Sequence, residues 1–188
     1  VYAFNNFISD LKAPNSTSIE AIRGISITSS TATSTVGLYY NSIFLNASGG
    51  ANFGSSGIFH TLSATATTAS LDMRNNIVVN NSTPSGTGFT VAFRRSAATS
   101  LNNYSETSNN NDFYAGTPGA SNLIFYDGTN ADQTIQDFKD WVTPRESASF
   151  SENPPFINST TAPFNLHMNT AVATQVESGG FSVTTPLA

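Results

Sequence analysis

Four short segments of the sequence decide its fold: Asn6-Phe7-Ile8, Asn41-Ser42-Ile43, Asn76-Ile77-Val78 and Asn111-Asp112-Phe113. Each begins with Asn, carries an apolar residue two positions later, and lies 35 residues after the segment before it. Self-similarity at a fixed period of roughly 20 to 50 residues is the signature of repeat architectures. The chain is therefore expected to build one structural unit several times and to stack the copies.

Apolar residues precede each Asn in the same register. Two positions of the repeat, two residues apart, are apolar in the first three copies. The first position is occupied by Val1, Val36 and Leu71, and the second by Ala3, Leu38 and Met73. This spacing is typical of a strand that turns one face toward a core. The fourth copy is weaker, since Glu106 and Ser108 stand at these positions.

A second column of apolar segments is offset from the first. It consists of Gly24-Ile25-Ser26-Ile27, Gly57-Ile58-Phe59-His60, Gly88-Phe89-Thr90-Val91 and Asn122-Leu123-Ile124-Phe125, at intervals of 33, 31 and 34 residues. Stretches rich in Ser, Thr, Gly and Pro separate the two columns. Each period therefore holds at least two short strands, and the sequence predicts a solenoid with coils of about 31–35 residues.

The Asn column implies a bend in every coil. In the first copy the inward positions are 1 and 3 before the column and 6 and 8 after it, and an uninterrupted strand cannot change face in this way. We therefore expect a bend between residues 3 and 6 of each copy, where Asn tolerates left-handed backbone. The amides of the column are expected to form a structural ladder, each donating to the next carbonyl. Its members are Asn6, Asn41, Asn76 and Asn111. Alternatively, they are ordinary turn residues.

The pattern changes after residue 130. Ile135, Phe138 and either Trp141 or Val142 recur at helical spacing and predict one short helix near 131–142, with Asn130 as its cap, Gln133 at the capping-box position and Pro144 as its stop. Residues 153–158 and 164–168 predict two more short strands, and 178–188 a last strand or a cut end. We expect one β-helix segment over 1–188, with repeat coils in 1–130 and a closing segment in 131–188, as a fragment of a longer chain.

Composition excludes several classes of function. Ser, Thr and Asn make up 71 of the 188 residues, whereas charged residues make up only 10%. The net charge of −5 argues against a nucleic-acid partner. The absence of Cys excludes disulfides, thiolate metal sites and a Cys nucleophile, and in an extracellular protein it points to a bacterial source. No run of 18 apolar residues occurs, so no membrane span is expected.

The repeats and the closing segment together resemble a known group. The resemblance rests on the four Asn-led copies, on segments 108–119 and 122–130, on the helix with Phe138 and Trp141, and on Pro144-Arg145, Ser147, Pro155-Phe156-Ile157 and Leu166-His167-Met168. These features resemble the right-handed parallel β-helix domains, pectin-lyase-like in fold, of large secreted bacterial surface proteins that often end in a type IX secretion sorting domain. The resemblance implies an all-β, right-handed parallel β-helix. In that group an Asp-rich, calcium-loop-like stretch commonly follows the Gly pair, but here Phe181 follows Gly180, so that metal site is not carried over.

Acidic residues do not form a catalytic pair. Hydrolases of the pectin-cleaving kind resemble one another in Asn-Thr-Asp, Asp-Asp and Gly-His-Gly strings, and none of these occurs here. Asp72 lies between inward Leu71 and Met73 and is expected to face solvent. The other candidates surround the predicted helix, where a solvated face explains them: Asp127, Asp132, Asp137 and Asp140.

Basic residues on strands are candidates for the base of a lyase. They are Arg23, Arg74, Arg94 and Arg95. A joint site is conceivable, since Arg74 lies in the strand of the Asn column and the others flank the Gly column. An unpaired Arg is a poor base, however, because it is always protonated. Ion pairing or packing of the alkyl stems is the favoured explanation.

The remaining polar residues offer no catalytic or metal-binding pattern. His60 and His167 take part in no Ser-His-Asp or His-cluster spacing and are expected to be lone surface or edge histidines. The segment 127–132 has calcium-like oxygen spacing over its first half but lacks a closing bidentate Glu. We therefore expect no catalytic residues, no metal and no cofactor.

The sequence favours a structural or adhesive module that is extracellular or on a bacterial cell surface. Expected partners are adjacent domains of the same long chain, other copies stacked end to end as a filament, and polysaccharide. The alternative is a polysaccharide lyase or glycoside hydrolase acting on uronate-rich polysaccharide.

Overall fold

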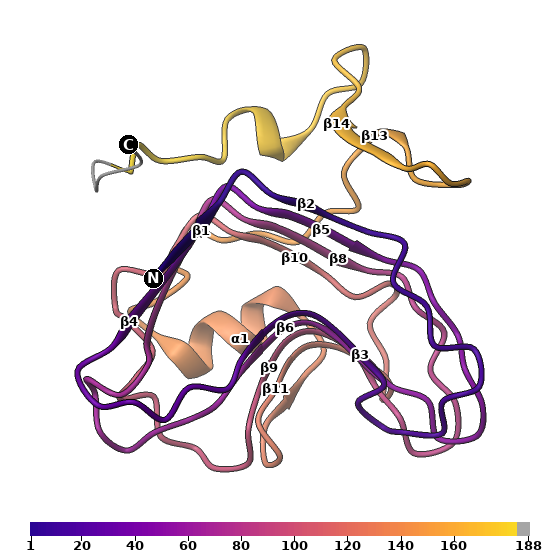
Figure 1. The fold of residues 1–188 in the computed structure, drawn as a ribbon. Helices are drawn as coiled ribbons and strands as arrows, with labels where there is room; N and C mark the ends of the chain where they lie inside the picture. The colour runs from indigo at the N-terminus through magenta and orange to yellow at the C-terminus, as the bar shows by residue number, and fades with distance from the viewer. Residues whose placement is uncertain (184–188) are drawn as a thin grey trace.

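The computed structural model describes residues 1–183 and shows a β-solenoid of stacked coils with parallel strands. Three sheets form its walls (Figure 1). Sheet A contains β1 (Tyr2–Phe4), β4 (Thr35–Tyr39) and β7 (Ser70–Arg74). Sheet B contains β2 (Phe7–Ile8), β5 (Ser42–Leu45), β8 (Ile77–Asn80) and β10 (Asp112–Tyr114). Sheet C contains β3 (Ile22–Ile27), β6 (Ser55–His60), β9 (Thr90–Arg95), β11 (Asn122–Tyr126) and the short β12 (Ala131–Asp132). The predicted all-β solenoid is confirmed.

The strand register confirms the period of 35 residues in sheets A and B. Ser42 pairs with Phe7 on one side and with Ile77 on the other, and Leu38 of sheet A pairs with Ala3 and Met73. In the fourth coil, sheet A has no strand, only isolated bridges such as Leu71 to Tyr104. The weaker fourth copy in the sequence therefore corresponds to a weaker fourth coil.

The predicted register of sheet C is wrong from its third strand onward. Ile58 pairs with Phe93, so Gly57 lies opposite Ala92 and not opposite Gly88, and Asn122 pairs with Thr90. Gly88 lies instead against the preceding coil, where an added Cβ would come within 1.9 Å of the Phe53 carbonyl oxygen. This Gly reflects a close approach of two loops, so it does not mark the same strand position as Gly57.

The predicted bend is confirmed, one residue before each Asn of the column. Asn5, Tyr40, Asn75 and Asn110 all have left-handed backbone, with φ of 55°, 54°, 58° and 60°. Three of these four residues are Asn, the residue type besides Gly that adopts this conformation most readily. The chain turns here from sheet A into sheet B.

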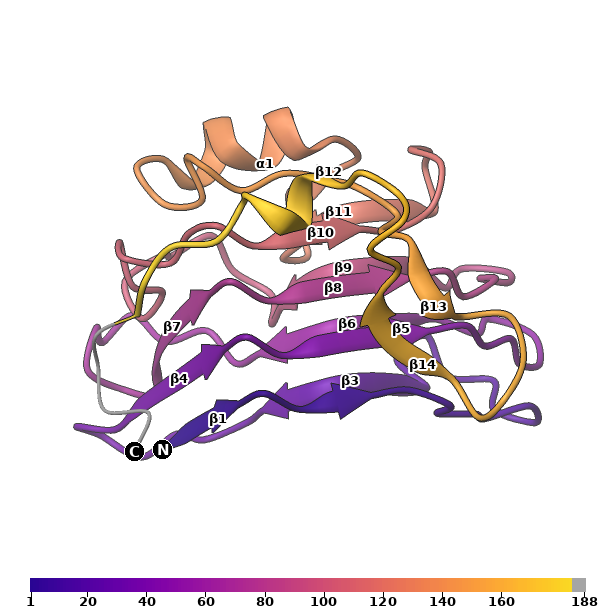
Figure 2. The same cartoon turned by 90° about the horizontal axis from the view of Figure 1, so that it is seen from above.

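The helix α1 (Ile135–Val142) lies across the last coil (Figure 2) and buries Phe138 and Val142. The helix starts later than predicted. Its N-cap is Thr134, whose hydroxyl accepts a hydrogen bond from the Asp137 backbone N–H, because Asn130 is already held in a turn by Asp127. Within residues 1–183, no helix has the length and apolar character needed to cross a membrane.

The rest of the closing segment folds back over sheet B. The two predicted strands are confirmed as an antiparallel hairpin of β13 (Phe156–Asn158) and β14 (Asn165–Met168). Phe156 and Leu166 pack on Phe44 and Val79 of the outer face of sheet B. After the short 3-10 helix η1 (Gln175–Glu177), residues 178–183 form no strand, and the remaining part of the predicted last strand, 184–188, lies outside the described residues.

Candidate functional site

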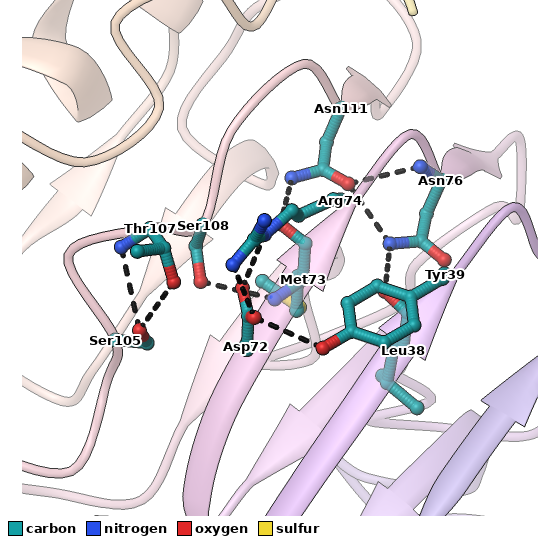
Figure 3. Close-up of polar contacts among 10 residues, drawn as sticks. All are labelled: Leu38, Tyr39, Asp72, Met73, Arg74, Asn76, Ser105, Thr107, Ser108 and Asn111. Carbon is teal, nitrogen blue, oxygen red and sulfur yellow. Dashed lines mark hydrogen bonds and ion pairs between the residues drawn. The ribbon is translucent and has the colours of Figure 1, made fainter. Parts of the chain in front are cut away.

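The side chains of the Asn column form a continuous line of hydrogen bonds along the solenoid. The Nδ2 atoms of Asn6, Asn41 and Asn76 each donate to the Oδ1 atom of the Asn one coil further, at 2.8, 2.9 and 2.9 Å. Each of these Oδ1 atoms also accepts the backbone N–H of the preceding Asn. The second amide hydrogen is used as well, as when Asn76 donates to the Leu38 carbonyl at 2.8 Å (Figure 3). The line therefore has a direction: each bond from one Asn side chain to the next donates toward the C-terminal coils, while the second amide hydrogen of Asn41 and of Asn76 donates to a backbone carbonyl of the preceding coil.

A buried carboxylate closes this line. Asn111 donates to Glu146 Oε2 at 2.9 Å, and the hydroxyls of Tyr104 and Ser149 donate to the same carboxylate. A carboxylate is an acceptor only, so it ends a chain of donors without leaving a buried group unpaired. Burial raises the pKa of Glu146. Glu146 follows Asn111 by 35 residues, so it occupies the fifth position of the same repeat column, with a carboxylate in place of the amide.

The opposite end of the solenoid is open (Figure 2). Ile22 and Ile27 of the first coil are buried, but most of its other inward apolar residues are only partly buried, in contrast to Leu38, Ile43 and Ile58 in the second coil. The partly buried residues are Ala3, Ile8, Leu11, Ala13 and Ile25. Among residues 1–183, no group donates to Oδ1 of Asn6, and strands β1, β2 and β3 pair on one side only. The first coil thus presents both an apolar surface and unpaired backbone.

Two of the candidate arginines lie on the outer face of sheet C. Arg94 and Arg23 both form ion pairs with Glu20, the former at 3.0 Å. The Arg23 guanidinium lies 3.4 Å from the centre of the Phe59 ring, and that of Arg94 lies 4.8 Å from the centre of the Tyr126 ring. A hollow of about 380 Å³ opens beside them. Burial lowers the pKa of Arg94.

Arg74 lies on sheet A, whereas Arg23 and Arg94 lie on sheet C. The joint site considered for these arginines is therefore not formed. It pairs with Asp72, whose Oδ2 also accepts the hydroxyl of Tyr39 at 2.9 Å (Figure 3). Asp72 points outward as expected but is buried under these two side chains, so the expectation that it faces solvent is wrong. Burial and the hydrogen bond to Asp72 raise the pKa of Tyr39 to about 12.

The expectation for His60 is also wrong, because its ring is fully buried inside the solenoid. Its Nε2 lies 2.9 Å from the Ala69 carbonyl oxygen, and burial together with the nearby Arg95 lowers its pKa to about 4. Arg95 points inward as well and donates to the Ser100 carbonyl at 2.6 Å. His167 is exposed, as expected, and packs edge-on against Phe7.

The acidic residues near the helix divide into two kinds. Asp137 and Asp140 are exposed on α1, as expected. Asp127 is buried, contrary to expectation, and its carboxylate is occupied by the Thr129 and Asn130 backbone N–H groups, which shape the turn after β11. Asp132 is half-buried, and desolvation raises its pKa to about 6. Across the described residues, no group of three His, Cys, Asp or Glu side chains is placed to hold a metal ion.

Comparisons of this chain with protein-family models, with curated proteins and with solved structures find no match. The class of protein is therefore defined by the structure itself: a β-solenoid with parallel strands, one end closed by a helix and a buried Glu, and one end open.

Proposed function

We propose that this chain is a structural or adhesive β-solenoid module of an extracellular bacterial surface protein, and that its first coil is where a further solenoid coil stacks. The observation that carries the proposal is the open end. It combines partly buried apolar side chains, strands paired on one side only, and the side-chain Oδ1 of Asn6, to which none of residues 1–183 donates. Unpaired strand edges are templates for further pairing.

The direction of the Asn line defines the chemistry of the coil that fits. Asn6 donates to Asn41 and has an acceptor left over, so the coil above it must supply a donor at the same position. An Asn in the same repeat position does this. Because α1 covers the other end, stacking takes place at the first coil only, and an open-ended filament of this chain is not part of the proposal.

The extracellular setting is supported by composition and by the resemblance of the repeats. Strands joined by backbone and Asn hydrogen bonds replace charge and disulfides as the source of rigidity in a chain with 10% charged residues and no Cys. The hollow beside Arg94 is lined by the half-buried ring of Tyr126, and aromatic rings are surfaces on which sugar rings stack. We therefore include polysaccharide among the proposed partners.

Catalysis on uronate-rich polysaccharide is the less favoured alternative. Arg94 and Arg74 lie on different sheets, and each is engaged by a carboxylate. We expect no unsaturated products and no new reducing ends when the protein is incubated with pectate, alginate or neutral glycans, with or without calcium. Sustained product release that the Arg94→Ala or Arg74→Ala variant abolishes would overturn the structural proposal in favour of a lyase.

Adding a coil tests the stacking proposal. A copy of residues 36–70 joined in front of Val1 places a second Asn41 one period before Asn6. The extended chain should unfold at higher temperature and higher urea concentration, because the first coil becomes an interior coil. The matched control carries Leu at the copied Asn41. If the extended chain gains no stability, or if the control gains as much, the open end does not select a coil with this Asn.

A further inference from the structure

A hollow on the outer face of sheet B is not used by the proposed stacking. It lies between the sheet and the C-terminal segment, which runs above β2, β5, β8 and β10 in Figure 1. Its volume is about 240 Å³. Aromatic rings of Tyr40 and Phe150 and aliphatic side chains of Ile77 and Val176 form much of its wall.

Asp112 is the one ionisable carboxylate in the lining of this hollow. It occupies the outward position of β10 in register with Ile77, and its side chain is almost fully buried, with 1% exposed. Its Oδ1 accepts the Glu152 backbone N–H at 2.8 Å. Its Oδ2 is buried and accepts no hydrogen bond from any described residue. A buried carboxylate oxygen without a donor is costly, so its partner is missing.

The missing partner must donate a hydrogen bond to Asp112 Oδ2, and a positively charged donor would bind the carboxylate most strongly. Among residues 1–183, no Lys, Arg or His lines the hollow, and the other charge that acts on Asp112 is the carboxylate of Glu152. A metal ion does not fit, because the described residues offer no set of three ligands. The aromatic and aliphatic walls suit an apolar body, and aromatic rings also attract an organic cation.

The segment above the hollow is held by its backbone. Phe181 exchanges two hydrogen bonds with the Asn75 side chain, at 2.7 and 2.8 Å, and Asn110 donates to the Gly179 carbonyl at 2.9 Å. The Phe181 side chain itself is 62% exposed, so it anchors nothing. Residues 179–183 therefore form a strap beside the hollow that is held by the side chains of Asn75, Asn110 and Tyr40 rather than by apolar packing of Phe181.

We propose that this hollow binds a small organic cation, an ammonium group joined to an apolar body, with the ammonium on Asp112 Oδ2 and the body between Tyr40 and Phe150. The site is independent of the stacking at the first coil. Burial holds the pKa of Asp112 well above its usual range. A bound cation favours the ionised form and lowers that pKa, which gives a second readout.

The test uses benzylammonium as the probe and benzyl alcohol as its neutral counterpart, each titrated into the whole chain by calorimetry and by NMR. Benzylammonium should bind saturably, and the Asp112→Asn variant should bind it at least about tenfold more weakly. The Asp10→Asn variant is the matched control, since Asp10 is exposed and pairs only with Lys12, and its affinity should equal that of the wild type. The carboxyl carbon of Asp112 should titrate at lower pH when the probe is bound.

A second variant keeps the test decisive if Asp112→Asn does not fold. Ser42 lines the hollow, and Ser42→Leu adds bulk there while leaving Asp112 in place, so it should weaken binding as well. The proposal is overturned if benzylammonium shows no saturable binding, if benzyl alcohol binds equally well, or if Ser42→Leu and Asp112→Asn bind like the wild type.

Discussion

The two ends of the solenoid are built from the same repeat and differ in what covers them. At the closed end, α1 packs Phe138 against Phe93, Phe113 and Phe125, and Glu146 accepts the last amide of the Asn line. At the open end, the inward residues Ala3 and Ile8 are only partly buried, whereas Leu38 and Ile43, their pairing partners one coil further in, are 1% and 0% exposed. One added layer therefore changes a partly exposed inward position into a fully buried one.

This difference shows that a coil of this repeat does not complete its own core. Each coil buries all of its inward residues only when another coil or a cap lies on both sides, as is general for solenoids. The closed end obtains its second side from the closing segment. The open end has none among the described residues, and this is why our proposal places the stacking of a further coil there.

The largest expected effect compares Phe residues at the two ends. Phe138→Ala leaves a cavity in the aromatic cluster and should lower the free energy of unfolding by about 3 to 5 kcal/mol. Phe7→Ala removes a half-exposed ring at the open end and should cost less than about 1 kcal/mol. Urea unfolding of both variants measures the contrast. Equal losses would contradict the distinction between a covered end and an open end.

The second effect is the pH dependence of stability that results from burial of His60 in the second coil. His60 lies in the second coil with its pKa lowered to about 4, so it stays neutral in the folded state while the unfolded chain takes up a proton below about pH 6.5. Its contribution is fully present above pH 6.5 and is lost as the pH falls toward 4, by about 3 kcal/mol.

The buried acids Asp112 and Glu146 oppose this trend, because their raised pKa values stabilise the fold as the pH falls. The measurement is therefore the difference in pH dependence between the wild type and His60→Gln, with His167→Gln on the surface as control. The His60 variant should lack this acid-dependent loss. A profile parallel to that of the wild type would show that His60 does not remain neutral.

A third and smaller effect compares two members of the Asn line. Asn76→Leu leaves the Oδ1 of Asn111 and the Leu38 carbonyl without their side-chain donor in the interior and should destabilise by about 1 to 3 kcal/mol. Asn6→Leu at the open end should cost less than about 1 kcal/mol. Thermal melts of both variants suffice. An unchanged melting temperature for Asn76→Leu would show that the line contributes nothing to stability.

The smallest effect involves two stacked Tyr residues. Tyr39→Phe removes a buried hydrogen bond to Asp72, which keeps its contacts with Arg74, and should cost about 0.5 to 1.5 kcal/mol. Tyr2→Phe, one coil toward the open end, should leave the stability unchanged within about 0.5 kcal/mol. If the two variants behave alike, the outer face of sheet A is solvated in both coils.

The repeat made much of the fold predictable. The period of 35 residues, the bend before each Asn, the helix and the two strands near the C-terminus all follow from local pattern and turn chemistry, whereas the pairing of these two strands as a hairpin does not. The register of sheet C did not, because Gly88 is selected by the approach of two loops, which a one-dimensional alignment does not distinguish from a strand position.

Burial of polar side chains was the other feature that local pattern could not give. Asp72 points outward but is covered by Tyr39 of the preceding coil and by Arg74 of its own strand, and His60 stands at a strand end but lies beside the Asn103 side chain of the next coil. The role of Glu146 was accessible from the period, but only by asking which acceptor could end a line of donors.

Amide hydrogen exchange on the unmodified chain tests the central claim most directly. The free energy of local opening, measured for the hydrogen-bonded amides of each strand, reports how well that strand is covered on both sides. If the first coil is open, the amides of β3 exchange through openings of clearly lower free energy than those of β6 and β9. Protection of β3 equal to that of β9 would contradict the claim, because the first coil would then be as stable as an interior one without a neighbour.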